Sequence, residues 1–216
     1  MIIFDCDGVL VDSEILSNAI DAQLMTAAGW PITAGDIIRG HIGQPKAVIW
    51  AQIAALRGAP WPEGLLEEAD ALLWQRMATE LQPVEGIRDA LERLPGPKAV
   101  ASSSALPKLR RSLEVCGLSD FFGPHVYSAS QVARGKPFPD VFLFAARQCG
   151  VDPADCLVVE DSVAGVTAAR AAGMRVVGLT AGRHSWPEHG PQLMAAGAAR
   201  IFTRSADLTQ AALAAL

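Results

Sequence analysis

Long apolar runs are missing from this sequence: no stretch approaches the ~20 consecutive apolar residues that a membrane-spanning helix requires. Clustered positive charge is missing too, since the net charge is -5 and no basic run occurs. Nucleic-acid binding needs a concentrated Lys/Arg surface, so the two absences exclude large classes of partner. Without a signal peptide ahead of the first apolar segment, we expect a cytoplasmic protein with neither a membrane nor a nucleic-acid partner.

Cysteine is scarce and scattered, and no two cysteines form a CxxC pair. The four are Cys6, Cys116, Cys149 and Cys156. Neither a zinc site nor a disulfide framework is therefore indicated, and we expect buried free thiols. Histidine is equally rare and shows no metal-ligand spacing; its four positions are His41, His125, His184 and His189. We expect these histidines to lie at the surface.

What the sequence does contain is enough apolar material for a large core. Apolar residues make up 50% of the 216 residues, and charged residues make up 19%. A chain of this length buries roughly 70% of its unfolded surface and needs no cross-links to fold. With its frequent glycine and proline, the composition is typical of a compact α/β protein, either one large domain or a domain with an insertion.

Two carboxylates stand where the first predicted strand ends. Residues 2–4 form an apolar run that suits a strand covered on both faces, and Gly8 lets the backbone pass close to a ligand. Because side chains alternate along a strand at period two, Asp5 and Asp7 can face one site. Paired carboxylates otherwise repel, so they suggest a divalent cation, and Mg²⁺ fits because it prefers oxygen ligands and shares them with phosphate.

A block without predicted strands follows the first strand. Apolar residues recur near a period of 3.6 from Ile15 to Ala28, and Gly29 ends this helix. Further helices are predicted at 34–38, 45–57 and 63–81. We therefore predict an inserted helical cap domain at 15–82 and a core domain formed by 1–14 and 83–216. Four of the five tryptophans lie in the cap, where we expect them mainly to pack its interior.

After Pro83 the pattern alternates between helix and strand. Helices are predicted at 84–94, 163–172 and 206–215, and strands at 97–101, 125–128, 156–159, 175–179 and near 200–202. Such alternation predicts an α/β fold with a doubly wound parallel sheet, into which the all-helical cap is inserted. In such sheets ligands bind outside the carboxyl ends of the strands. The polar residues that follow predicted strands are Asp5, Asp7, Ser102, Lys136, Glu160 and Asp161.

These polar residues stand in motifs that resemble those of the haloacid dehalogenase (HAD) superfamily. The stretch Asp5-Cys6-Asp7-Gly8-Val9-Leu10-Val11-Asp12-Ser13 resembles the first motif, Ser102 the second, Gly135-Lys136-Pro137 the third, and Glu160-Asp161-Ser162 with Gly165 the fourth. The motifs occur in the family's order and span most of the chain. The resemblance implies a Rossmann-like core and a phosphohydrolase activity.

The resemblance also implies a role for each motif residue. Asp5 would attack phosphorus to form an aspartyl-phosphate, and Asp7 would protonate the leaving alcohol and then take a proton from water. Ser102 would bind a phosphate oxygen, and Lys136 would neutralise charge on the phosphate and the nucleophile. Ser103 would bind substrate, or else Ser103 or Ser104 would cap the following helix.

The implied metal is Mg²⁺, held by oxygen ligands at the strand ends. The Asp5 carboxylate, the Asp7 main-chain carbonyl and Asp161 would be its ligands. Glu160 would be either a further ligand or an acceptor that orients a metal-bound water.

The cap after the first motif resembles the subgroup of β-phosphoglucomutases, phosphoglycolate phosphatases and sugar-phosphate phosphatases. The favoured function is a Mg²⁺-dependent phosphatase acting on a small phosphorylated sugar, sugar acid or polyol. A hexose-phosphate mutase is an alternative, but Ser17 stands where such mutases carry a histidine that couples cap closure to substrate binding. A phospho-accepting receiver module is disfavoured, because Glu160 and Asp161 come late and a cap is present.

Substrate specificity is expected to come from the cap turn at 40–46, which resembles the substrate-contacting loop of the subgroup. Gln44 could form hydrogen bonds with substrate hydroxyl groups, and Lys46 could contact an anionic or hydroxyl-rich leaving group. A solvated loop without such contacts is the alternative. We further expect a monomer or a weak homodimer.

Overall fold

The computed structural model describes residues 1–41 and 44–215 and places one parallel sheet at the centre of the core. Its strands are β1 (Ile2–Phe4), β2 (Lys98–Ser102), β3 (Val126–Ser128), β4 (Leu157–Glu160), β5 (Arg175–Leu179) and β6 (Ile201–Phe202). The order β3-β2-β1-β4-β5-β6 puts β1 between β2 and β4, and every pairing is parallel. The predicted doubly wound α/β fold is therefore confirmed.

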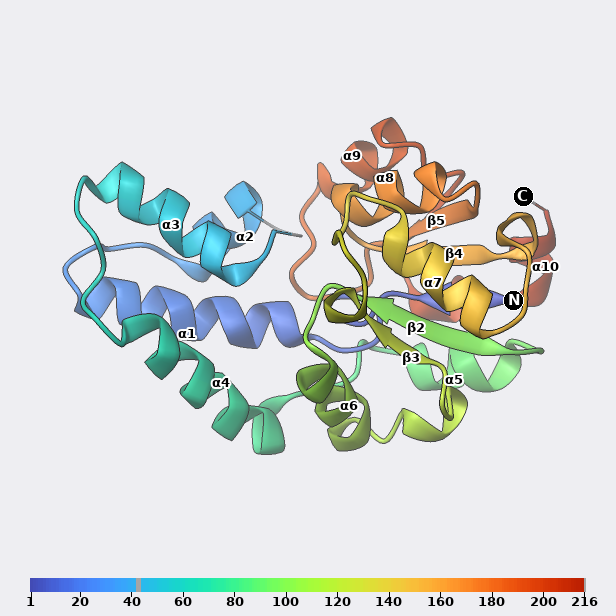
Figure 1. The fold of residues 1–216 in the computed structure, drawn as a ribbon, viewed down its shortest axis with the longest axis horizontal. Coiled ribbons are helices and arrows are strands. Elements are labelled where there is room, and N and C mark those ends of the chain that lie inside the picture. The colour runs from blue at the N-terminus through green and yellow to red at the C-terminus, as the bar shows by residue number, and fades with distance from the viewer. Residues whose placement is uncertain (42–43, 216) are drawn as a thin grey trace.

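Both faces of the sheet are covered, which explains its continuous apolar strands. Phe4 and Val159 pack into one hydrophobic cluster, whereas their neighbours Ile3 and Val158 pack into another on the opposite face. This division follows from the alternation of side chains along a strand. The carboxyl ends of β1, β2 and β4 consequently meet at one edge of the sheet (Figure 1).

The core helices divide between the two faces of the sheet. They are α5 (Ile87–Arg93), α6 (Leu106–Val115), α7 (Asp140–Gln148), α8 (Val163–Ala171), α9 (His189–Ala195) and α10 (Gln210–Ala214). Residues of α7, α8 and α9 share one cluster with Ile3, and residues of α5, α6 and α10 share the other with Phe4. The helix predicted at 206–215 begins only at Gln210, because the Thr209 hydroxyl caps it there by accepting from the Ala212 amide.

The described part of the stretch between β1 and α5 contains four helices: α1 (Ser13–Ala27), α2 (Ala34–His41), α3 (Lys46–Arg57) and α4 (Leu65–Glu80). Figure 1 shows them standing off one end of the sheet. Trp50 and Trp61 pack edge to face with ring centroids 5.5 Å apart, and the Trp61 indole donates to the Trp50 carbonyl. The domain limits 15–82, 1–14 and 83–216 stay a prediction.

The described helices include none that could span a membrane, because none is both long and apolar enough. All four cysteines are free thiols, and Cys6, Cys116 and Cys156 are buried as expected, whereas Cys149 is only partly buried.

Candidate active site

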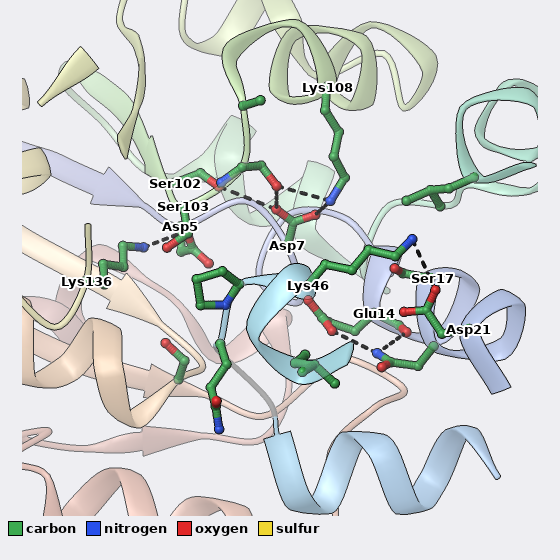
Figure 2. Close-up of a pocket in the computed structure, with 18 of the residues that line it drawn as sticks. Asp5, Asp7, Glu14, Ser17, Asp21, Lys46, Ser102, Ser103, Lys108 and Lys136 are labelled. Atoms are coloured by element: carbon green, nitrogen blue, oxygen red, sulfur yellow. Dashed lines mark hydrogen bonds and ion pairs between the residues drawn. The ribbon is translucent and has the colours of Figure 1, made fainter. Parts of the chain in front are cut away.

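A cavity of about 350 Å³ lies between the carboxyl edge of the sheet and the helices α1, α3 and α4. Figure 2 shows side chains from both sides pointing into it. All the residues that the sequence placed at a site contribute to its lining except Glu160, which lies behind it, fully buried. Gln44, Pro45 and Lys46 of the cap turn reach the same space. Ile42 and Gly43 of that turn lie outside the described residues.

Lys136 connects the first and fourth motifs at the bottom of this cavity. Its Nζ donates to Asp5 Oδ1 over 2.7 Å, to Glu160 Oε1 over 2.6 Å and to the Ala101 carbonyl over 3.0 Å. Burial alone would lower the pKa of Lys136, but the charges of Asp5 and Glu160 outweigh it and raise that pKa. The ammonium is therefore firmly charged.

Glu160 is anchored by the turn that starts α8. Its Oε2 accepts from the amides of Asp161 and Ser162 and from the Ser162 hydroxyl, over 2.9, 2.8 and 3.0 Å. The space it fills exists because residue 165 is glycine: a Cβ there would lie 1.7 Å from Glu160 Oε1. Ser162 also caps α8 by accepting from the Gly165 amide. The fourth motif thus fixes the position of the Glu160 carboxylate through hydrogen bonds and close packing.

Three carboxylates come together at this point. Asp5, Glu160 and Asp161 each offer an oxygen within 4.8 Å of the others, and all three residues are buried. Burial is the main reason why the pKa of Asp5 is raised well above its usual value, although Lys136 opposes the effect. A cluster of buried carboxylate oxygens with excess negative charge suits a hard divalent cation, so the residues fit Mg²⁺.

The Asp7 side chain points away from this cluster, towards α6 (Figure 2). Its Oδ1 accepts from Ser13 Oγ over 2.5 Å and from Lys108 Nζ over 3.0 Å, and its Oδ2 accepts from Ser104 Oγ over 2.6 Å. Ser102 Oγ lies 3.4 Å from the same Oδ2. Burial would raise the pKa of Asp7, but Lys108 and the hydroxyls of Ser104 and Ser13 outweigh it and lower that pKa to about 2. Asp7 is therefore ionised in this arrangement.

Lys108 and Ser104 are site residues that the sequence reasoning missed. Lys108 Nζ also donates to Ser104 Oγ over 3.0 Å, which links the two across one helical turn. The available signal was a lysine four residues after the serine run, since positions i and i+4 share a helix face. The alternative that Ser103 or Ser104 caps this helix is wrong, because α6 begins after Ala105 and no side chain caps it.

The histidine prediction is wrong for two of the four residues. His184 and His189 are 4% and 1% exposed, and both meet Asp161. His184 Nε2 lies 2.9 Å from Asp161 Oδ2, and His189 Nε2 donates to the Asp161 carbonyl over 2.5 Å. Trp186 stacks on the His189 ring at 4.3 Å. These residues follow β5, whose end adjoins β4, so the fold brings them to a carboxylate more than twenty residues earlier.

The cap side of the cavity carries a second charged group. Lys46 Nζ lies 3.0 Å from Asp21 Oδ1 and 2.9 Å from Asp70 Oδ1. Gln44 Oε1 accepts from the Gln52 amide over 2.9 Å, although Gln44 still lines the cavity. Ser17 and Ser103 line it as well, and no cap tryptophan is among its described lining residues. Trp30, Trp50 and Trp61 pack in the hydrophobic cluster, as expected, whereas Trp74 is half exposed, so the packing prediction is wrong for Trp74.

A parallel sheet with a buried lysine and an acidic cluster at its carboxyl edge defines the class, a hydrolase on a Rossmann-like core. The chain belongs to the haloacid dehalogenase-like hydrolases, whose family model matches residues 1–173. The resemblance read from the motifs is thereby confirmed, as is the expected enzyme class, a phosphoric monoester hydrolase.

Individual relatives support the family over most of the chain. A haloacid dehalogenase-like protein of unknown function from Agrobacterium tumefaciens is 41% identical, with 99% of this chain and 97% of that chain covered and a TM-score of 0.92. Hexitol phosphatase B from Escherichia coli is 31% identical over 182 residues, 81% of this chain and 81% of that protein. The chloroplastic protein Suppressor of quenching 1 from Arabidopsis thaliana is 32% identical over 82% of this chain, which spans only 17% of that protein.

Proposed function

We propose that the protein is a Mg²⁺-dependent phosphatase that hydrolyses a small phosphorylated sugar, sugar acid or polyol through a covalent intermediate on Asp5. The observation that carries the proposal is the position of the Asp5 carboxylate, which accepts from the Lys136 ammonium and belongs to the buried carboxylate cluster at the bottom of the cavity. Hexitol phosphatase B, a relative named for a polyol phosphatase activity, supports the same reaction class.

Asp5, Asp161 and the Asp7 main-chain carbonyl would hold the metal ion. When bound, Mg²⁺ supplies positive charge to the phosphoryl oxygens and to the attacking carboxylate. Both oxygens of Glu160 already accept hydrogen bonds from Lys136 and the α8 turn. This favours the second of the two roles considered for Glu160, an acceptor that orients the ligand shell.

Asp5 would attack phosphorus in line, and the bond to the leaving oxygen would break as the aspartyl-phosphate forms. Lys136 holds the nucleophile in place and stays close to the charge that develops on the phosphoryl group. A fixed electrostatic contact of this kind is typically worth about 3–4 kcal/mol in the transition state. Ser102, at the end of β2, would hold a phosphoryl oxygen.

Asp7 would protonate the leaving alcohol and then take a proton from the water that hydrolyses the intermediate. The first step needs a protonated carboxyl, whereas Lys108 and the hydroxyls hold Asp7 ionised. An arriving phosphate dianion raises the pKa of a nearby carboxyl, since like charges disfavour ionisation. We therefore propose that Asp7 acquires its proton together with the substrate.

Hydrolysis is favoured over mutase chemistry by Ser17, which lines the cavity on α1. A mutase has to keep water away from its aspartyl-phosphate until a sugar phosphate accepts the group. A serine at this position has no ring to couple cap closure to the sugar. The expected product is therefore free phosphate, without a requirement for a bisphosphate.

The test compares phosphate release from a panel of sugar phosphates by the wild-type protein and Asp5→Asn, with and without chelator. We expect loss of turnover in Asp5→Asn, loss on chelation and recovery with Mg²⁺. Acid quenching with ³²P-labelled substrate should leave label on the wild-type chain only. Asp207→Asn, on the surface and paired with Arg204, is the matched control. Full turnover in Asp5→Asn, or interconversion of hexose phosphates without phosphate release, would contradict the proposal.

A further inference from the structure

The wall of the cavity that a leaving group would face is acidic. We call it the cap wall, formed by Glu14, Asn18 and Asp21 of α1, Lys46 of α3 and Asp70 of α4, all of which line the cavity. Figure 2 shows Glu14, Asp21 and Lys46 across the cavity from Asp5 and Lys136. The cap wall therefore contains three carboxyl groups and one ammonium group.

The Lys46 ammonium is not available to a second anion. It lies 3.0 Å from Asp21 Oδ1 and 2.9 Å from Asp70 Oδ1, so two carboxylates already balance its charge. The next lysine towards the phosphoryl site, Lys108, is likewise paired with Asp7. Among the described residues that line the cavity, this leaves Lys136, which already serves Asp5 and Glu160.

Glu14 adds a carboxyl group that faces no cation at hydrogen-bond distance among the contacts described. Its Oε2 accepts from the Asn18 side-chain amide over 3.0 Å. Burial is the main cause of its raised pKa, and the charge of Asp7 adds to the effect. A carboxyl of this kind can both donate to and accept from alcohol groups, whereas it repels a carboxylate or a phosphate whenever it is ionised.

We propose that the leaving group is an uncharged polyhydroxy alcohol, and that the cap wall excludes sugar acids and bisphosphates. The proposal rests on the phosphatase function proposed above and narrows its substrate class. Carboxylates and an amide are acceptors and donors for hydroxyl groups, while an extra anion would have to approach uncompensated negative charge. A cavity of about 350 Å³ stands at the small end of ligand pockets, which suits a single sugar-sized group.

The test uses two substrates that differ in one group. Glucitol 6-phosphate and gluconate 6-phosphate have the same chain, but the first ends in a hydroxymethyl group and the second in a carboxylate. We expect kcat/KM to favour glucitol 6-phosphate by about tenfold or more, the ratio that one close repulsion between like charges produces. A ratio of one, or a preference for gluconate 6-phosphate, overturns the inference.

p-Nitrophenyl phosphate tests the phosphatase activity independently of the cap-wall selectivity, because its leaving group carries neither a carboxylate nor several hydroxyls. Hydrolysis of this ester with a ratio of one would overturn the cap-wall inference and leave the phosphatase standing. Failure to hydrolyse any ester would overturn the proposed function, and the inference with it.

Reversing the charge of Asp70 tests whether the substrate preference arises from the cap wall. Asp70 has a side chain that is 63% exposed, so Asp70→Lys should fold, and it should shift the ratio towards gluconate 6-phosphate by about tenfold. Asp36→Lys is the matched control, since Asp36 is an exposed cap residue paired with Arg39 and is not among the residues lining the cavity. An unchanged ratio in Asp70→Lys, or an equal shift in Asp36→Lys, overturns the assignment to the cap wall.

Discussion

The core and cap sides of the cavity use the same charged group in different surroundings. On the core side the Lys136 ammonium lies between Asp5 and Glu160, at 2.7 and 2.6 Å. On the cap side the Lys46 ammonium lies between Asp21 and Asp70, at 3.0 and 2.9 Å. The side chain of Lys136 is 3% exposed and that of Lys46 is 21% exposed. We call Lys136 with Asp5 and Glu160 the core group, and Lys46 with Asp21 and Asp70 the cap group. Each group pairs one ammonium with two carboxylates, so solvent access is the main difference between them.

The difference in solvent access suits the core group to hold the reacting atoms in place and the cap group to influence which substrates bind. Breaking a buried ion pair leaves charges that water cannot solvate, which typically costs about 3–5 kcal/mol. An exposed pair contributes about 0–1 kcal/mol because water screens and replaces it. The core group is therefore suited to hold reacting atoms in place. The cap group is open to water through Lys46 and Asp70, and it influences the substrate mainly through its sign of charge.

The largest effect is expected for Lys136→Met, which removes the ammonium from the core group. Asp5 and Glu160 would remain buried without their counter-ion, so the free energy of unfolding should fall by about 3–5 kcal/mol and turnover should be lost. Denaturant unfolding without metal measures the first effect, and phosphate release measures the second. Arg204→Met, at an exposed pair, is the control. A loss below about 1 kcal/mol would remove the contrast with the cap group.

The next largest effect is expected for Gly165→Ala, which adds a methyl group to the space that the Glu160 carboxylate fills. In Gly165→Ala the new Cβ would meet Glu160 Oε1, so the carboxylate must move away from Lys136. We expect a loss of about 1–3 kcal/mol in stability together with lower turnover. Gly40→Ala is the matched control, because Gly40 is also helical and a Cβ there meets nothing within 4 Å. Equal thermal unfolding curves for the two variants would show that the Glu160 carboxylate tolerates displacement.

His184→Ala should have a smaller effect, confined to Asp161. His184 Nε2 lies 2.9 Å from Asp161 Oδ2, so its loss frees a carboxylate that is proposed to bind the metal. Loss of such a supporting contact typically lowers metal affinity by about 10–100-fold. Calorimetric titration with Mg²⁺ measures the affinity without relying on turnover. His125→Ala is the control, since His125 contacts Tyr127 and Cys149 instead. Unaltered Mg²⁺ affinity in His184→Ala would make this contact structural only.

Lys46→Ala should give the smallest loss of stability, about 1 kcal/mol or less, because Lys46 and Asp70 are accessible to water. Asp21 remains buried, but its pKa is already raised, mainly by burial, so it can take up a proton once the lysine is gone. Denaturant unfolding beside Lys136→Met makes the comparison direct. Similar losses in the two variants would mean that burial does not separate the two groups.

Sequence by itself determined the sheet and the chemistry at its edge. Apolar runs marked the strands, and a polar residue at the end of each run had to reach one edge because parallel strands end together. Asp5, Ser102, Lys136 and Asp161 therefore meet at the cavity as predicted. Helix limits were harder to predict, since a side-chain cap such as Thr209 moves a boundary by several residues.

Only the tertiary structure decided which side chains face one another across different elements. Asp7 turns towards Lys108, His184 reaches Asp161 from the segment after β5, and Lys46 is balanced by two other cap helices. None of these contacts follows from a period or a motif, because each depends on how two elements pack and where a loop returns. The sequence could place Lys46 at the cavity, but the charge that surrounds it came from α1 and α4, which fold against it.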